Sequence, residues 1–207
     1  MALTDASFGL NIAQVEAEIR SNPGLAARSW QTAALDREQH WIGLPPETLL
    51  TPYDELVSML QQLAPKNGST LVDLGAAYGR LGLVIGRCFP ELSFVGYECV
   101  AERVNEANRC LSIQGFGARI RVERQDLSAT DFSPIAADSY FLYDFGSREA
   151  IEKTLEDLRR IASSQPIAVV GRGRASRDAI ERRHPWLSEV IPPWHAANYS
   201  IYRSGYR

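Results

Sequence analysis

Glycine residues and an acid mark the end of a short apolar run in the segment LVDLGAAYGRLGLVIG, residues 71–86. Gly75 and Gly79 permit the dihedral angles of a tight turn and let a ligand approach the main chain closely. The helical pattern that follows the turn offers free N–H groups at its first residues. Asp73 lies two residues before the first glycine. The segment therefore predicts a ligand site where a strand passes into a helix.

Two more acidic residues follow later strand-like runs. Glu98 ends the run FVGYE, roughly 20 residues after the glycine turn, and a carboxylate there can accept hydrogen bonds from both hydroxyls of a ribose. Asp126 follows the run IRVERQ and can accept a hydrogen bond from an adenine amino group. One glycine turn alone is a weak signal, but three such elements in this order indicate a nucleoside site.

The glycine spacing separates two kinds of nucleoside cofactor. A dinucleotide site usually reads GxGxxG, which brings a pyrophosphate onto the helix N-terminus. This chain instead has glycines at positions 75, 79 and 82, and Asp73 stands where its charge would repel a pyrophosphate. S-adenosylmethionine carries a sulfonium and an ammonium group and no phosphate. The turn therefore favours S-adenosylmethionine over NAD.

Short apolar runs alternate with amphipathic helical patterns after Pro65. The runs are Leu71–Leu74, Leu92–Tyr97, Ile120–Glu123, Tyr140–Tyr143 and Ile167–Val170. Such alternation predicts an α/β fold with parallel strands, right-handed crossovers and helices on both faces of the sheet. The final runs, WLSEVIP and NYSIYRS, have no helical pattern between them and predict an antiparallel hairpin at the end of the sheet.

The chain divides into an N-terminal helical extension, residues 1–50, and an α/β domain, residues 51–207. The first predicted helix is marked by Ile12, Val15 and Ile19 at helical spacing. A second helix is predicted over about residues 25–38, and another from Thr51, with that residue as its N-cap. The extension is interpreted as a lid or substrate platform, with a cap over one sheet edge as the alternative.

The composition is that of an ordinary globular domain. The 207 residues suffice for one sizeable core, and the net charge of −3 gives no general attraction to nucleic acid or to anionic membranes. The arginine-rich stretch 172–183 is interpreted as a solvated helix face, with an anion or nucleic-acid patch as the alternative. No segment approaches the ~20 apolar residues of a membrane helix. We expect no membrane partner and do not expect nucleic acid.

The cysteines and histidines give no sign of a metal site. Three cysteines without a CxxC pair argue against a disulfide framework and against zinc, and the three histidines are scattered. The N-terminal residues lack the basic and apolar regions of a signal peptide. We therefore expect a cytoplasmic protein without a metal.

The motifs VDLGAAYGR, VGYE and RQDL together resemble the class I S-adenosylmethionine-dependent methyltransferases, over about residues 51–207. The resemblance implies a Rossmann-like seven-stranded sheet of order 3-2-1-4-5-7-6 whose last strand is antiparallel. It implies S-adenosylmethionine as cofactor and S-adenosylhomocysteine as product. Ala77 departs from the family pattern, because the turn commonly has a glycine there.

The resemblance also assigns roles in the cofactor site by position. The methionine end falls to Asp73, Gly75 and Gly79, the ribose to Glu98, and the adenine to Asp126 and Leu127, while Ala76 and Cys99 are assigned to the same site as neighbours of these residues. The segment LTPYDELVSML is also similar to one upstream of the first strand in small protein-lysine methyltransferases. There a threonine and an aromatic residue help to bind the methionine part, and Thr51 and Tyr53 match them.

The fourth predicted strand ends in YFLYDFGS, which in this fold faces the transferable methyl group. Asp144 can orient an amine or accept its proton, and Tyr143 or Phe145 can line a channel and face a cation. In the alternative interpretation the aromatics only pack and Asp144 caps the next helix. The Asn/Asp-Pro-Pro-Tyr motif of many amino methyltransferases is missing, which argues against the usual DNA or glutamine acceptor.

These residues predict methyl transfer to a nitrogen, with a protein lysine as one candidate acceptor. The alternatives are a small-molecule methyltransferase of the same fold and a non-catalytic binding module. An NAD-dependent oxidoreductase is disfavoured by the glycine spacing and by Asp73.

Overall fold

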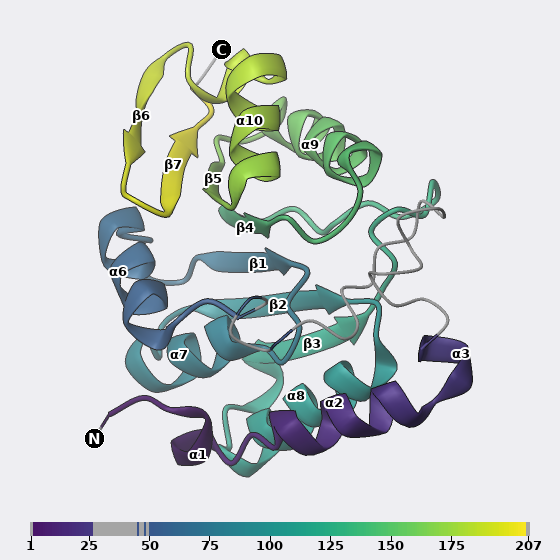
Figure 1. Cartoon of the computed structure of the whole chain (residues 1–207). Coiled ribbons are helices and arrows are strands. Elements are labelled where there is room, and N and C mark those ends of the chain that lie inside the picture. The colour runs from purple at the N-terminus through teal and green to yellow at the C-terminus, as the bar shows by residue number, and fades with distance from the viewer. Residues whose placement is uncertain (1, 27–44, 46–47, 49, 206–207) are drawn as a thin grey trace.

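The computed structural model describes residues 2–26, 45, 48 and 50–205. A seven-stranded sheet lies at its centre in the order β3-β2-β1-β4-β5-β7-β6, with helices on both faces (Figure 1). The strands are β1 (Thr70–Leu74), β2 (Ser93–Glu98), β3 (Ile120–Arg124), β4 (Ser139–Tyr143), β5 (Ala168–Arg172), β6 (Ile191–His195) and β7 (Tyr199–Arg203). The strand order confirms the predicted fold class.

The strands β1 to β5 run parallel, whereas β7 is antiparallel to both β5 and β6. The terminal hairpin is therefore confirmed, but its first arm begins later than WLSEVIP predicts. Pro185 instead starts the 3-10 helix Pro185–Leu187, which buries Leu187. β6 then pairs irregularly between Ile191 and Trp194, because the two prolines between them have no amide hydrogen to donate.

Each face of the sheet carries its own apolar core. Helices α6 (Tyr53–Leu63), α7 (Arg80–Cys88) and α8 (Ala101–Ile113) cover one face, and α9 (Arg148–Ala162) and α10 (Arg174–Arg183) cover the other (Figure 1). Along β1, Leu71 belongs to the first core, whereas Leu74 belongs to the second. Because side chains alternate along a strand, Asp73 points toward α6 and α7, on the same side as Leu71.

The N-terminal residues form three helices, α1 (Asp5–Phe8), α2 (Ile12–Ser21) and α3 (Pro23–Ala26), and α2 packs against α8 (Figure 1). The helix predicted from Ile12, Val15 and Ile19 is confirmed, and these three side chains are buried. The helix predicted over about residues 25–38 falls almost wholly outside the described residues.

The expectation that Thr51 caps the next helix is wrong. Pro52 stands at the N-cap position and α6 begins at Tyr53, so Thr51 lies one residue too early. Pro52 itself makes no side-chain capping hydrogen bond.

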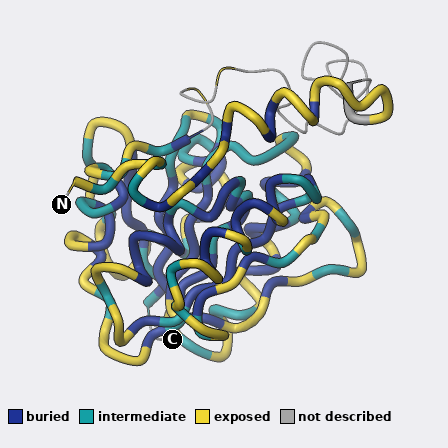
Figure 2. The backbone as a smooth tube through the Cα atoms, turned by 90° about the horizontal axis from the view of Figure 1, so that it is seen from below, coloured by how far each residue is buried: buried dark blue, intermediate teal, exposed yellow. Residues whose placement is uncertain are grey.

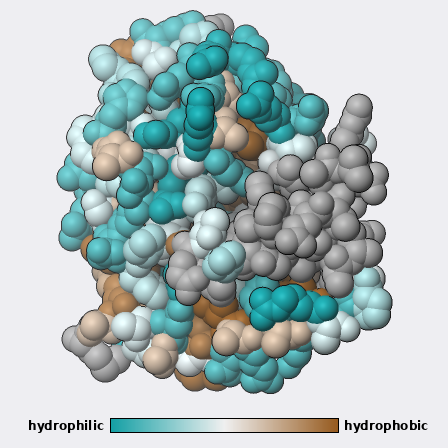
Figure 3. Space-filling view, in the orientation of Figure 1, coloured by the Kyte–Doolittle hydropathy of each residue, from teal (hydrophilic) through white to brown (hydrophobic). Residues whose placement is uncertain are grey.

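The burial pattern follows this layered arrangement. Buried residues concentrate in the interior, and exposed residues mark the loops and the outer side of α2 (Figure 2). Hydrophilic side chains cover the region of α10 (Figure 3), where Arg174 lies 3.8 Å from Asp178 and Arg183 lies 2.5 Å from Glu152. These ion pairs agree with a solvated helix face. Among the described residues, none of the helices has the length and apolar content needed to cross a membrane.

Candidate functional site

The turn between β1 and α7 has an unusual backbone. Gly75, Ala77 and Gly79 have φ angles of 96°, 45° and 67°, in the left-handed region that side chains with a Cβ rarely adopt. A Cβ at Gly75 would lie 2.5 Å from the Cβ of Phe145, so glycine is required there on steric grounds as well. Ala77 holds such an angle with a methyl group, at the position where the family pattern has a glycine.

Hydrogen bonds attach this turn to the end of β2. The amides of Gly75 and Ala76 both donate to the carbonyl of Tyr97, at 3.0 and 2.8 Å. The amide of Ala77 donates to Glu98 Oε2 at 3.0 Å, and the amide of Val100 donates to Oε1 of the same carboxylate at 2.9 Å. Glu98 is therefore buried beneath the turn, where it orders the two loops that follow β1 and β2.

Asp73 lines a small, partly open cavity of about 30 Å³ between the sheet and α6. The lining residues are Thr51, Leu56, Met59, Asp73, Leu81, Phe141, Leu142, Tyr143, Val170 and Arg172. Burial, together with the negative charge of Glu98, raises the pKa of Asp73 to about 7. The end of the first strand therefore holds a carboxyl that a neighbouring positive charge would stabilise.

The residues predicted to border the adenine lie just beyond β3. Gln125 donates its amide to the carbonyl of Glu98 at 2.9 Å, so this loop lies beside the end of β2. Leu127 is buried, whereas Asp126 accepts hydrogen bonds from the amide and hydroxyl of Ser128 at 2.8 and 2.6 Å. The loops after β1, β2 and β3 thus meet at one edge of the sheet.

Thr51 and Tyr53 lie differently with respect to the cavity. Thr51 lines it, and its carbonyl accepts a hydrogen bond from Arg80 at 3.3 Å. The hydroxyl of Tyr53 instead donates to Asp5 at 2.8 Å, and burial with the charge of Asp5 raises the pKa of this phenol. The structure therefore brings Thr51, but not the hydroxyl of Tyr53, to the cavity that contains Asp73.

Tyr143 lines the cavity with one ring face covered. The guanidinium of Arg172 lies 4.2 Å from the ring centroid, and Arg172 Nε lies 2.7 Å from Glu55. The Tyr143 hydroxyl donates to the carbonyl of Thr48 at 3.0 Å. An arginine of the chain itself therefore covers this face of the ring, and the predicted contact with a ligand cation stays a prediction. Sequence reasoning missed the pair formed by Arg172 and Glu55, although an arginine at the end of a strand is a visible signal.

Asp144 binds the N-terminus of α10. Its carboxylate accepts from the amides of Ala175 at 3.3 Å and Ser176 at 2.7 Å, and from the Ser176 hydroxyl at 2.7 Å. A Cβ at Gly173 would lie 2.4 Å from this carboxylate, so only glycine fits there. The bonds agree with the capping alternative, although the helix is α10 and not the next one, α9, which Ser147 caps.

The two remaining predicted residues pack close to the turn. Ala76 is buried in the core on the α7 side. Cys99 donates to Glu98 at 3.4 Å, and burial with the charge of that carboxylate raises the pKa of the thiol, which disfavours a nucleophilic role. Among the described residues, no group of histidine, cysteine and carboxylate side chains is arranged to hold a metal.

Solved structures share this architecture at low sequence identity. An RNA methyltransferase from Salinibacter ruber, crystallised with S-adenosyl-L-homocysteine, matches 75% of this chain and 92% of its own at 21% identity and a TM-score of 0.53. An S-adenosylmethionine-dependent methyltransferase from Aquifex aeolicus matches 77% of this chain and 92% of its own at 16% identity and a TM-score of 0.53. No family model and no curated protein sequence matches the chain.

A third structure extends the comparison to another acceptor. An S-adenosylmethionine-dependent O-methyltransferase from Thermotoga maritima matches 76% of this chain and 68% of its own at 16% identity and a TM-score of 0.57. Together with the strand order, these likenesses define the fold as that of the S-adenosylmethionine-dependent methyltransferases. At such identities they carry the fold and not the acceptor.

Proposed function

We propose that the protein is an S-adenosylmethionine-dependent methyltransferase that acts on a nitrogen acceptor. The proposal depends above all on two inward-facing carboxyl groups at one edge of the sheet, Asp73 in the cavity and Glu98 beneath the glycine turn. The raised pKa of Asp73 reflects burial and the negative charge nearby. A cationic ligand would relieve both, whereas a pyrophosphate would add a further negative charge. The site therefore suits a cationic nucleoside better than NAD.

Each loop of this edge has a part in the proposed cofactor site. The glycine turn, Thr51 and Asp73 hold the methionine end, Glu98 accepts from the ribose hydroxyls, and Asp126 with Leu127 borders the adenine. Ala76 and Cys99 support the turn and the Glu98 carboxylate from inside. Tyr53 acts indirectly, because its hydroxyl binds Asp5.

The cavity wall supports a nitrogen acceptor. When bound, the cofactor supplies a methyl group on a positively charged sulfur, which a lone pair can attack in line. The wall contains the apolar side chains of Leu56, Met59, Phe141 and Val170, which favour a neutral amine over an ammonium ion. Among the described residues that line the cavity there is no histidine or lysine to deprotonate a hydroxyl acceptor.

In this proposal the loop after β4 contributes the form of the acceptor pocket and does not transfer a proton. Tyr143 forms part of the wall, and Asp144 positions the β4 loop against α10. Residues 51–207 form the methyltransferase domain in this proposal, and residues 1–50 form its extension. A protein lysine is the first candidate acceptor, and the alternatives are a small molecule and a binding module without catalysis.

Calorimetric titration with S-adenosylmethionine, S-adenosylhomocysteine and NAD tests the proposal. We expect binding of both adenosyl ligands and none of NAD. Transfer of labelled methyl groups to a protein extract or to a metabolite extract then separates the two acceptor classes. Adenosyl binding without any transfer favours the binding module, and no adenosyl binding contradicts the proposed cofactor.

A further inference from the structure

A buried ion pair joins the N-terminal helix α2 to the glycine turn. Glu16 Oε1 lies 2.9 Å from Arg103 Nη2 and 3.0 Å from Arg103 Nε, and it accepts the hydroxyl of Tyr78 at 2.8 Å. Glu16 and Tyr78 are each only 1% exposed, and Arg103 is 3% exposed. Tyr78 is part of the glycine turn, directly before Gly79. The carboxylate of Glu16 on α2 therefore holds Tyr78 in the glycine turn, which is the predicted cofactor turn.

A second polar attachment lies at the start of α7, the helix that follows the turn. Asp5 accepts Arg80 Nε at 2.9 Å and pairs with Arg80 Nη2, and it also accepts the hydroxyl of Tyr53 at 2.8 Å. The ring of Tyr53 stacks on Phe8 with centroids 5.5 Å apart. Tyr78 and Arg80, which flank the N-cap residue Gly79 of α7, are thus both bound by residues of the N-terminal segment.

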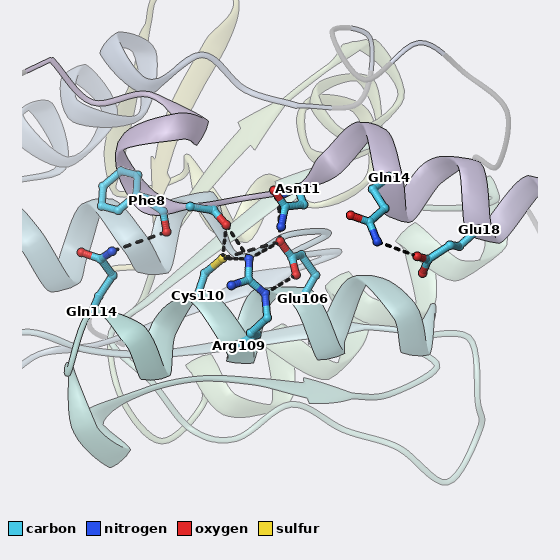
Figure 4. Close-up of polar contacts among 9 residues, drawn as sticks. Phe8, Asn11, Gln14, Glu18, Glu106, Arg109, Cys110 and Gln114 are labelled. Atoms are coloured by element: carbon cyan, nitrogen blue, oxygen red, sulfur yellow. Dashed lines mark hydrogen bonds and ion pairs between the residues drawn. The ribbon is translucent and has the colours of Figure 1, made fainter.

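The link between α1 and α2 is itself fixed to α8 (Figure 4). The amide of Asn11 donates to Glu106 at 2.7 Å, and Arg109 binds the carbonyl of Gly9. Gln114 Nε2 donates to the carbonyl of Phe8 at 3.4 Å. These bonds attach the segment to α8. The two contacts with the turn, Glu16 with Tyr78 and Asp5 with Arg80, therefore come from a segment that is itself held in place.

Arg103 also connects this segment to the proposed ribose carboxylate. Burial alone lowers the pKa of Arg103, but the negative charges of Glu98 and Glu16 outweigh it and raise the pKa. With Glu16 present, the arginine shares its attraction between two carboxylates.

We propose that residues Asp5–Ser21 form a strap that sets the shape of the Gly75–Gly79 turn, and that Glu16 and Asp5 are positioning residues for the adenosyl cofactor. The inference rests on the proposed function. It assigns the described part of the extension to the cofactor side, where the sequence suggested a lid or a substrate platform. Neither residue touches the reacting atoms; both act through Tyr78, Arg80 and Arg103.

Two tyrosine variants separate this role from general stability. Tyr78→Phe removes the hydroxyl that reaches Glu16, and Tyr140→Phe removes a buried hydroxyl that bonds Ala137 and Ile135 elsewhere in the sheet. We expect Tyr78→Phe to weaken S-adenosylhomocysteine binding about fivefold and Tyr140→Phe to leave it within about twofold. We expect both variants to lower the melting temperature, because each loses a buried hydrogen bond. Equal affinities for the two variants would overturn the proposal.

Two glutamate variants on α2 test the charge itself. Glu16→Gln should weaken S-adenosylhomocysteine binding about tenfold, whereas Glu18→Gln, at an exposed site that bonds only Gln14 in Figure 4, should change it less than about twofold. The double variant with Tyr78→Phe should lose less affinity than the sum of the two single losses, because both changes weaken one connection. Fully additive losses would contradict a shared path through Tyr78.

Hydrogen exchange without ligand keeps the two proposals distinguishable. Glu16→Gln should speed exchange of the Gly75–Gly79 amides relative to Glu18→Gln, whatever the protein binds. If the unmodified protein binds no adenosyl ligand, the proposed function fails, and this measurement alone decides on the strap. Unchanged exchange of the turn amides in Glu16→Gln would overturn the strap.

Discussion

The turns after β1 and β4 have similar backbone features, but the carboxyl groups beside them differ in their electrostatic surroundings. Each holds a non-glycine residue at positive φ, Ala77 at 45° and Asp144 at 31°, and each places a carboxylate against main-chain amides. At the β4 turn, Asp144 receives three hydrogen bonds from the start of α10. At the β1 turn, Asp73 has a raised pKa because burial and Glu98 disfavour its charge. Under the proposed function the carboxyl group of Asp73 meets a positively charged ligand, whereas the carboxylate of Asp144 is already bound by main-chain amides.

The largest effect is expected when charge is removed from the turn after β1. Asp73→Asn and Glu98→Gln should each weaken S-adenosylmethionine binding roughly 100-fold, because each removes charge-assisted contacts worth about 2–3 kcal/mol. Calorimetric titration measures the loss. Glu123→Gln is the matched control, since this glutamate on β3 pairs with Arg121 at the surface. Unchanged affinity in both site variants would remove Asp73 and Glu98 from the cofactor site.

The same charge should have a measurable cost for folding. The folded pKa of Asp73 is raised from 3.8 to about 7, so the group's contribution to stability is present below pH 3.8 and is lost as pH rises through 7. Asp73→Asn should therefore increase the free energy of unfolding by about 2 kcal/mol at pH 8 and change it little at pH 4. Urea unfolding at the two pH values measures this. A destabilised Asp73→Asn variant at pH 8 would show that Asp73 is satisfied without a ligand.

Binding of the cofactor should also depend on pH through Asp73. A cationic ligand binds the ionised form of Asp73, and a free-protein pKa of about 7 means that this form disappears as the pH falls. Affinity for S-adenosylmethionine should fall about tenfold from pH 7.5 to pH 6. Titration at a series of pH values tests this, with Asp73→Asn expected to give a flat profile. A flat profile in the unmodified protein would mean that Asp73 does not meet the cation.

The smallest effect on cofactor binding is expected from substitutions in the turn after β4. Asp144→Ala should lower the free energy of unfolding by about 1 kcal/mol, as the loss of a helix cap does, and leave cofactor affinity within about twofold. Ser147→Ala removes the N-cap of α9 and is the matched control. If Asp144 only positions its loop, both variants should retain similar methyl transfer. A much larger loss of transfer in Asp144→Ala would assign it a direct role in the reaction.

The sheet and the turn after β1 could be predicted because the sequence patterns that indicate them are local. Alternating apolar runs and helical patterns give the strands, and Gly75, Gly79 and Glu98 lie next to strand ends that can be read from the sequence. The first arm of the hairpin was misplaced because Pro185 starts a 3-10 helix that the apolar pattern of WLSEVIP does not reveal. The positions of residues at strand ends can thus be predicted from the sequence alone, and their roles stay predictions.

The partners of the β4 edge were not predictable, because they come from distant parts of the chain. Ser176 lies 32 positions after Asp144, and Glu55 lies 117 positions before Arg172. Glu16 did leave a signal, since it falls four residues after Ile12 on the buried side of α2, where a charge requires a partner. The identity of that partner, Arg103, required the packing of α2 on α8.

Phe145, in the turn after β4, packs against Gly75, in the turn after β1, so the two turns support each other. The aromatic side chain fills the space that a Cβ at Gly75 would need, at a hypothetical separation of 2.5 Å. A substitution that reshapes position 145 to admit a new acceptor therefore also changes what supports the glycine turn. Acceptor preference and cofactor affinity would then change together during laboratory evolution. Libraries that randomise Phe145 should consequently be screened for both properties at once.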